Sequence, residues 1–472
     1  MSFHWLARLA VLVFVLGCSS GPIRQLHSLG GNEFTLFPEE GPAPTPITCS
    51  GDAAQRFGCF RKEALDRVEK LDVAGALAVT TPDGTLYTLV RTDSLNERER
   101  TITEDTPFPA ASVTKMFLAA ASVSLSEAGS VDLQQPISRY LPELTSQAGV
   151  GRATLHQLLT HTAGLGNPPQ CEKGDEDLSS VLEKYGNAPL WSPPGALSNY
   201  SNLGYAFVAL VLERVTGKRF EDIVRERVLV PAGIPSATFG PQRVQVLDHH
   251  PSNAVLTRCR AMWPSGGLVL SVRELAHWAS ELARPDSFPL GRPLLELLTT
   301  PYVKHEARPG SAYGYGIGRE LQSGLTVFNH SGRLEGFSAF VGWIPERQLA
   351  VAAFANTPDL LPVAGGLRAL STFASISENW QAARVPAHPL SAYTGEYVDH
   401  VAALRRLRVS LEDGHLVIDY PEGVPALLPP GFRFEFEPGA ARARYVVSPI
   451  GVGERVADAS GGTSLTVGPG TR

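Results

Sequence analysis

The sequence predicts an α+β fold: an antiparallel sheet flanked by helices, with an all-helical subdomain and a small all-β domain at the C-terminus. Strand-like stretches come first, a block of helical patterns follows, and the chain then returns to strands separated by short turns. Strands and helices that are grouped rather than alternating are typical of an antiparallel sheet covered by helices. With 472 residues the chain also exceeds the usual size of a single core.

The N-terminus has the pattern of an export signal, which we assign to residues 1–17. Its apolar run LAVLVFVL is too short to span a bilayer. The stretch resembles a bacterial lipoprotein signal, in which the next residue, Cys18, is lipidated and becomes the mature N-terminus. An ordinary cleaved secretory signal is the alternative. We therefore expect an exported protein, lipid-anchored in the bacterial cell envelope and facing the periplasm or exterior, that meets the membrane only through this anchor.

A tether and two disulfides are expected next. Residues 18–50 are rich in Gly, Pro, Ser and Thr, as linkers are. The four cysteines that remain after Cys18 allow three pairings. We expect a short Cys49–Cys59 loop and a long-range Cys171–Cys259 bridge. Free buried thiols are the alternative, and they are less common outside the cytoplasm.

The main domain, residues 51–380, opens with a helix over 54–70 and a strand pair around the turn 82–84. A long helix is expected to begin near Pro107, with Thr106 as its N-cap, and to run to about residue 128 before Gly129 ends it.

Further helix boundaries follow from capping residues. Thr154 is the expected N-cap of a short helix, and a helix over 202–216 should end at Gly217. Ser271 and Glu274 form a capping-box pattern that opens another helix.

The C-terminal part of the chain reads as strands. An antiparallel meander is expected over 312–357, with turns at 322–324 and 345–347. The pattern changes around 381–390, and the remainder alternates strictly in FRFEFE, which predicts a separate β domain over 388–472.

Several classes of protein are disfavoured. The net charge of −6 does not steer the chain toward nucleic acid. The sequence has no phosphate-binding loop and no H-E-x-x-H helix, and the pair His249-His250 stands alone, so we expect no cofactor and no metal. The G-x-S-x-G match at 17–21 lies on no strand-to-helix turn and is discounted.

Ser112 and Lys115 point to catalytic chemistry. Residues three apart on a helix share a face, so the hydroxyl and the amine can meet. A serine becomes a good nucleophile when a neighbouring base takes its proton, and a lysine can do so if burial lowers its pKa. This Ser-x-x-Lys is the only one in the chain. The alternative is a solvated lysine beside a serine at a helix start.

The context of the motif favours catalysis. Ser112-Val113-Thr114-Lys115 is followed by Tyr200-Ser201-Asn202 and His330-Ser331-Gly332, with the phrases LLTHTAGL and PSGGL nearby. Over residues 65–360 the chain resembles the serine β-lactamase and penicillin-binding-protein superfamily, closest to the class C β-lactamase, DD-peptidase and esterase branch. Tyr185-Gly186-Asn187 is a second Tyr-x-Asn. We prefer Tyr200 because its motif directly precedes an amphipathic helix.

The resemblance implies roles for these residues. Ser112 would be acylated, with Lys115 and Tyr200 as catalytic partners, and the choice of base between the two stays open. Asn202 would bind the substrate's amide or ester flank. The backbone N–H groups of Ser112 and Arg333 would form the oxyanion hole. Substrate would lie along His330, Ser331, Gly332 and Arg333, where a side chain at 332 would block close approach.

His330 departs from the lysine of class C β-lactamases. A histidine is mostly neutral at pH 7 and holds a carboxylate less firmly. If His330 anchors a carboxylate, KM for anionic substrates should rise as the pH climbs through about 6.5. Arg333 is an alternative anchor. His161, in the HTAGL turn, is expected to be a structural hydrogen-bonding residue.

The sequence thus predicts an exported serine hydrolase that forms an acyl-enzyme with a small-molecule or peptide substrate. Candidate substrates are D-alanyl peptides, small esters and β-lactams. The alternative is a non-catalytic cell-wall or penicillin-binding receptor that keeps the fold. The C-terminal segment is similar to the small β-barrel-like domain of some family members, and its role and the oligomeric state are not predicted.

Overall fold

The computed structural model describes residues 49–376, with gaps, together with the backbone of nine strands outside that range. The gaps are 70, 98–100, 146–148, 168–170, 172–174, 191, 197, 245, 247–257, 305–310, 335 and 358–360. Cys18 and the pair His249-His250 lie outside the described residues, as does the predicted signal at 1–17. No helix among the described residues is long and apolar enough to cross a membrane.

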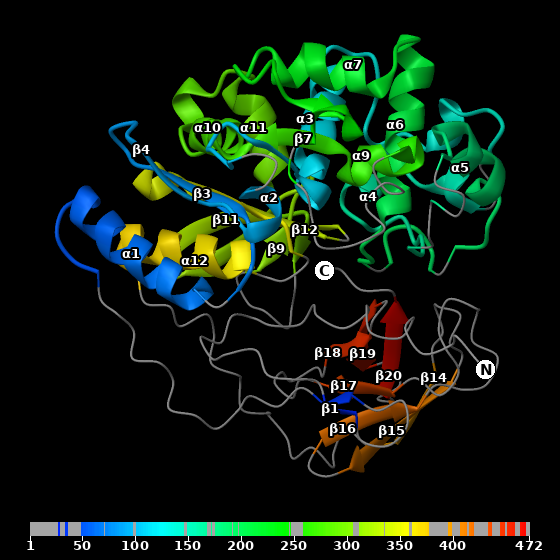
Figure 1. Cartoon of the computed structure of the whole chain (residues 1–472). Helices are drawn as coiled ribbons and strands as arrows, with labels where there is room; N and C mark the ends of the chain where they lie inside the picture. The colour runs from blue at the N-terminus through cyan, green and yellow to red at the C-terminus, as the bar shows by residue number, and fades with distance from the viewer. Residues whose placement is uncertain are drawn as a thin grey trace, which may run out of the picture.

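The centre of the main domain is an antiparallel sheet of eight strands (Figure 1). In spatial order the strands are β4 (Leu86–Arg91), β3 (Gly75–Thr80), β13 (Leu349–Ala355), β12 (Phe337–Ile344), β11 (Leu325–Leu334), β10 (Gly318–Gln322), β9 (Ala312–Tyr313) and β8 (Val303–Lys304). The strands β3, β12 and β13 are buried along most of their length and form the middle of the core. The predicted antiparallel sheet is therefore confirmed.

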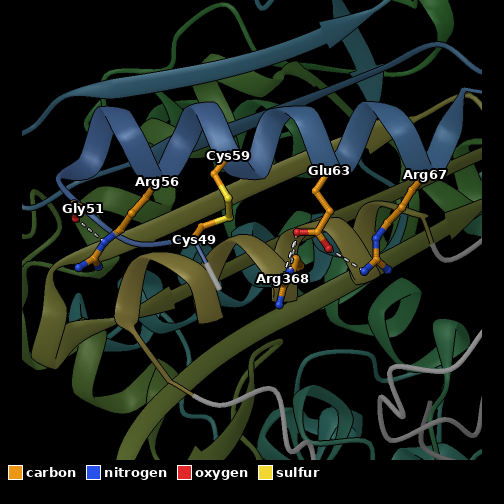
Figure 2. The surroundings of a disulfide bond; sticks show 7 residues. All are labelled: Cys49, Gly51, Arg56, Cys59, Glu63, Arg67 and Arg368. Carbon is orange, nitrogen blue, oxygen red and sulfur yellow. Dashed lines mark hydrogen bonds and ion pairs between the residues drawn. A yellow bond between two sulfur atoms is a disulfide. The ribbon is translucent and has the colours of Figure 1, made fainter. Parts of the chain in front are cut away.

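Two helices from opposite ends of the domain lie side by side on one face of this sheet, α1 (Ala53–Val68) and α12 (Leu361–Ala374) (Figure 1). Their apolar side chains join those of the sheet in one cluster, which includes Phe60, Val79 and Leu370. Glu63 of α1 pairs with Arg368 of α12, with 2.9 Å between carboxylate and guanidinium (Figure 2). The Cys49–Cys59 disulfide ties the chain before α1 to the same helix.

The other face is covered by the helical part of the domain. It consists of α3 (Thr114–Glu127), α4 (Leu155–Leu159), α5 (Leu178–Tyr185), α6 (Asn202–Thr216), α7 (Phe220–Val224), α9 (Trp263–Gly266), α10 (Val272–Leu282) and α11 (Arg292–Thr299), with the short α2 (Ser94–Glu97) nearby in the chain. Helix α10 packs on β3 and β13. A second sheet, in the order β5 (Pro107–Pro109), β7 (Leu268–Ser271) and β6 (Thr238–Phe239), lies within this half.

The helix expected from Pro107 begins later than predicted. Residues 107–109 form β5, which pairs with β7, and a 3₁₀ turn over Ala111–Val113 then leads into α3 at Thr114. Thr106 is therefore not an N-cap, and its hydroxyl accepts from the N–H of Thr103 at 2.8 Å. The physical reason is that a residue before proline avoids the helical region, and Pro107 and Pro109 impose this on two positions.

The other helix boundaries agree with the sequence. Thr154 and Gln157 form a capping box at the start of α4, and Ser271 and Glu274 do so for α10. Gly217, with φ of 67°, ends α6 in the left-handed region, as expected for a glycine cap.

In the C-terminal segment the structure describes seven strands, each antiparallel to the next. They are β14 (Gly395–Val398), β15 (Arg406–Glu412), β16 (His415–Asp419), β17 (Arg433–Phe436), β18 (Arg444–Ser448), β19 (Gly451–Ala457) and β20 (Thr463–Gly468). The strand content agrees with the expectation for 388–472, whereas a closed barrel-like domain stays a prediction. Near the N-terminus, β1 (His27–Ser28) pairs with β2 (Phe34–Thr35).

Candidate active site

Ser112 lies in the tight turn that joins β5 to α3. The turn is fixed by the ladder between β5 and β7 and by the N–H of Ala110, which donates to the carbonyl of Leu268 at 2.8 Å. Ala111 has φ of 48°, a left-handed conformation that costs free energy for a residue other than glycine. The half-buried Ser112 is thus held at the N-terminal end of α3, although not inside a regular helix.

Lys115 brings its amine to the Ser112 hydroxyl. Its Nζ lies 3.1 Å from Ser112 Oγ, 2.7 Å from Asn202 Oδ1 and 3.0 Å from the carbonyl oxygen of Ser265. Asn202 is the first residue of α6, and Ser265 belongs to α9. Three segments far apart in the sequence therefore converge on one amine.

The surroundings of Lys115 favour its neutral form. The side chain is fully buried, and burial lowers the pKa of the amine well below its usual value. The faces of the Tyr200 and Tyr205 rings, 4.6 and 5.5 Å from Nζ, attract a cation. We expect desolvation to outweigh this attraction, because a buried ammonium without a carboxylate partner is far more costly than a cation–π contact is favourable.

Tyr200 completes the group. Its hydroxyl donates to Ser112 Oγ at 2.7 Å, and burial raises the pKa of the phenol, so that the group keeps its proton. The rival Tyr185 is the last residue of α5, and Gly186 caps that helix. The structure therefore places Tyr200, rather than Tyr185, against Ser112.

The HTAGL segment holds the Tyr200 loop in place. The N–H of Ser201 donates to His161 Nδ1 at 3.1 Å, and the Ser201 hydroxyl donates to the carbonyl of Gly166 at 2.7 Å. The N–H of Asn202 donates to Asn167 Oδ1 at 2.9 Å. The His161 ring packs against the Tyr200 ring at a tilt of 36°, and burial lowers the pKa of its imidazole well below the usual value. It is a neutral hydrogen-bonding residue, in agreement with the sequence.

The third motif approaches Ser112 along β11. A Cβ atom at Gly332 would lie 2.3 Å from the carbonyl oxygen of Ala110 and 3.1 Å from the backbone nitrogen of Ser112. The glycine is therefore required because the strand packs against the protein's own serine turn, a reason that differs from the substrate approach inferred from the sequence. The ladder with β10 ends at Asn329, while that with β12 continues through Ser331 and Arg333 to the end of β11.

His330 is buried beside the same group. Its Nε2 lies 3.0 Å from the Tyr313 hydroxyl, and its Nδ1 lies 2.6 Å from the carbonyl oxygen of Ser331. Burial lowers the pKa of His330 to about 3. The pH dependence expected from an ordinary histidine near 6.5 therefore no longer applies, because that value assumed a solvated ring.

The sequence did not predict three residues that contribute to the candidate active site: Tyr313, Ser265 and Asn167. Ser265 acts through its backbone carbonyl, so its residue type carries no signal. Tyr313 lies in the AYGYG stretch, which reads only as a strand. The loop residue Asn167 binds a backbone N–H, a contact that depends on the fold.

Both expected disulfides are present, Cys49–Cys59 and Cys171–Cys259. Cys171, Glu176 and Cys259 also bring metal-binding atom types within 4.8 Å of one another. Because the two sulfur atoms are bonded to each other, no thiolate is available there, and the group is not a metal site in this state.

An apolar pocket lies next to the serine turn. It is partly open to solvent and lies between the side chains of Pro109, Met262, Trp263, Val269 and Leu334 and three glycines. One of these, Gly266, faces both Ala111 and Leu334. The pocket therefore lies beside the turn that holds Ser112, and its lining is mostly apolar, which suits an apolar group of a ligand.

Comparison with known proteins identifies the family of this chain. The chain matches the Beta-lactamase family over residues 61–371, and it belongs to that family. It is 32% identical to esterase EstB of Burkholderia gladioli over 200 residues, which are 38% of this chain and 50% of EstB. It is 25% identical to the D-alanyl-D-alanine-carboxypeptidase/endopeptidase AmpH of Escherichia coli over 271 residues, 51% of this chain and 68% of AmpH.

The fold is shared with solved structures. The octameric penicillin-binding protein homologue of Pyrococcus abyssi superposes with a TM-score of 0.61 at 18% identity, covering 88% of this chain and 96% of that chain. The superfamily inferred from the three motifs, which contains an esterase and a carboxypeptidase among these relatives, is thus confirmed.

Proposed function

We propose that this protein is a serine hydrolase that forms an acyl-enzyme on Ser112 with an ester or amide substrate. The observation that carries the proposal is the meeting of two groups at the Ser112 hydroxyl: the Lys115 amine lies 3.1 Å and the Tyr200 hydroxyl 2.7 Å from Ser112 Oγ. A hydroxyl, an uncharged amine and a phenol in this arrangement supply a nucleophile with an adjacent base and acid.

The hydrogen bonds support Lys115 as the base. A neutral amine has two hydrogens and one lone pair, and two of its three neighbours, Asn202 Oδ1 and the Ser265 carbonyl, can only accept. The lone pair is then left for the Ser112 hydroxyl. Tyr200 donates to the same oxygen and has a raised pKa, which suits an acid and not a base. We therefore assign proton abstraction to Lys115 and proton delivery to Tyr200.

The proposed reaction follows from these assignments. Lys115 takes the proton of Ser112 as Oγ attacks the carbonyl carbon, and the backbone N–H groups of Ser112 and Arg333 stabilise the oxyanion. Collapse of the tetrahedral intermediate expels the alcohol or amine, which receives a proton from the Tyr200 hydroxyl. The proton that Lys115 took from Ser112 then passes to Tyr200, so that both groups return to their starting forms. Water then attacks the acyl-enzyme by the same steps and releases the acid.

The substrate belongs to the range found among relatives: a D-alanyl peptide, a small ester or a β-lactam. EstB is named as an esterase and AmpH as a D-alanyl-D-alanine carboxypeptidase. The apolar pocket beside Gly266 supports a substrate with one small apolar group. The alternative is a receptor that binds such ligands without turnover.

Intact-mass measurement of acyl adducts tests the proposal. The protein is mixed with esters, D-alanyl peptides and β-lactams, and with a fluorophosphonate probe. We expect a mass increase equal to the acyl group, which decays as product forms, and none in Ser112→Ala. Labelling that persists in Ser112→Ala rules out the assigned nucleophile. Saturable binding without any adduct or product supports the receptor alternative.

We further propose export, with Cys18 as a lipidated residue. The two disulfides support an oxidising compartment. Mass spectrometry of the mature N-terminus of protein from its native host decides the matter: a diacylglyceryl-modified Cys18 is expected, and an unmodified N-terminus at another residue contradicts lipidation.

A further inference from the structure

The His330 ring uses both of its nitrogens within the protein. The carbonyl of Ser331, 2.6 Å from Nδ1, can only accept, so Nδ1 carries the proton and donates it. Nε2 is then the lone-pair nitrogen, and it accepts from the Tyr313 hydroxyl at 3.0 Å. Neither nitrogen has a hydrogen left to offer a substrate carboxylate.

The His330 ring is not readily protonated. A charged ring would present two donors, and the hydroxyl of Tyr313 would have to turn its hydrogen away from Nε2. His330 is only 6% exposed, and its burial holds the pKa far below neutrality. Burial also raises the pKa of Tyr313, so the phenol remains a donor.

The neighbouring groups that the structure describes add no cation on this face of β11. Burial favours the neutral form of the Lys115 amine, which is surrounded by three oxygens. Successive side chains of a strand point to opposite faces, so His330 and Gly332 share the face toward Ser112, and Arg333 extends from the other face. A carboxylate placed beside the serine turn would thus lose water without gaining a charged partner among the described residues.

We propose that this site selects substrates that are uncharged next to the scissile carbonyl, a neutral ester or amide, and that Tyr313 sets this selectivity by occupying Nε2 of His330. The inference rests on the acyl-enzyme function proposed above. This selectivity would differ from that of an active site in which a lysine ammonium group on the strand binds a substrate carboxylate.

Competition by arylboronic acids tests the inference, because boronic acids form tetrahedral adducts with nucleophilic serines. The matched probes are 3-carboxyphenylboronic acid and its neutral analogue 3-carbamoylphenylboronic acid, each competing with fluorophosphonate labelling of Ser112. We expect the wild type to bind the carboxylate at least about tenfold more weakly than the carbamoyl analogue, as for a polar group left without its partner.

Variants of the strand sharpen the test. His330→Lys introduces an ammonium and should shift the ratio toward the carboxylate by about tenfold or more. Tyr313→Phe removes the donor that occupies Nε2, which makes protonation of the ring easier, and should give a smaller shift in the same direction. If His330→Lys fails to fold, Tyr313→Phe alone decides. Tyr87→Phe, on β4 among Phe57 and Phe373, is the control and should leave the ratio unchanged.

The outcomes distinguish the inference from the function on which it rests. If the wild type prefers the carboxylate, the inference is wrong, and loss of that preference in Arg333→Ala identifies Arg333 as the anchor. Equal shifts in Tyr87→Phe and Tyr313→Phe also overturn the role of Tyr313. If no probe labels Ser112 at all, the proposed function is wrong, and the inference about selectivity is then wrong as well.

Discussion

Lys115 affects both the chemistry and the stability of the protein, and in opposite directions. Its amine is useful to Ser112 only when it is neutral, and burial supplies that state by making the charged form unfavourable. In the unfolded chain the same amine has its ordinary pKa near 10.5 and is charged at neutral pH. Folding therefore has to release a proton, and the active state is reached at the expense of stability.

Lys115→Met tests both effects. The variant should lose about 10²- to 10⁴-fold in kcat, the usual contribution of a general base. The native state of the wild type binds fewer protons than the unfolded state, so its free energy of unfolding should rise with pH until about 10.5. The variant lacks this rise. We expect the Tm of the variant, minus that of the wild type, to decrease as the pH rises toward 10.5.

Two results would contradict this prediction. A Tm difference that does not change with pH would mean that Lys115 is charged in the folded protein. Near-normal turnover by Lys115→Met would remove the lysine from its role as base, whatever the stability data show.

The individual residues also show which features of the site could be predicted from the sequence and which could not. Ser112, Lys115 and Tyr200 could be placed together because the motifs are local and carry side-chain chemistry. The choice between Lys115 and Tyr200 as base could not be made, because it depends on burial and on the backbone carbonyl of Ser265. The pKa near 6.5 that the sequence predicted for His330 was wrong because it assumed a solvated ring, whereas the ring is buried.

At the scale of elements, local signals were reliable and long-range pairing was not. The N-cap at Thr154 and the capping box at Ser271 each lie within four residues of sequence, and both predictions are confirmed. The start of α3 was misplaced because β5 exists through its ladder with β7, about 160 residues further along the chain. That pairing, and the turn it creates, are what place Ser112.

Gly332→Ala tests the close packing of β11 on the serine turn. The added Cβ would lie 2.3 Å from the carbonyl oxygen of Ala110, and the strand and the turn must move apart to relieve this contact. Because a displacement of about 1 Å in a catalytic site can cost about 10²-fold, we expect kcat/KM to fall by at least that factor, with a cooperative unfolding transition retained.

Gly58→Ala provides the control for this substitution. Gly58 lies in α1, and a Cβ there meets nothing within 4 Å. Alanine should raise the free energy of unfolding by about 0.5–1 kcal/mol through helix propensity and leave kcat/KM unchanged. If Gly332→Ala is as active as Gly58→Ala, the close approach of the strand is not needed for the reaction.

For the whole molecule, the site depends on joining a sheet-bearing half to a helical half. Ser112 and Lys115 come from the turn and α3, Tyr200 and Asn202 from the start of α6, and Gly332 from the sheet. The Cys171–Cys259 disulfide connects two of the supporting segments. Cys171 follows Gly166 and Asn167, which hold the Tyr200 loop, and Cys259 precedes Ser265, which holds Lys115.

The two disulfides should therefore differ in what their removal does. They close loops of very different length, with 88 and 10 residues of separation. The chain-entropy relation gives about 4.6 kcal/mol for Cys171–Cys259 and about 2.8 kcal/mol for Cys49–Cys59. We expect Cys171→Ala/Cys259→Ala to lower the Tm more than Cys49→Ala/Cys59→Ala, and only the former to lower kcat, because Cys49–Cys59 lies beside α1, on the face of the sheet away from Ser112. Differential scanning calorimetry and burst kinetics with one ester would measure both effects. If the two double variants lose kcat equally, general destabilisation explains the loss, and the Cys171–Cys259 disulfide has no special part in placing Tyr200 and Lys115.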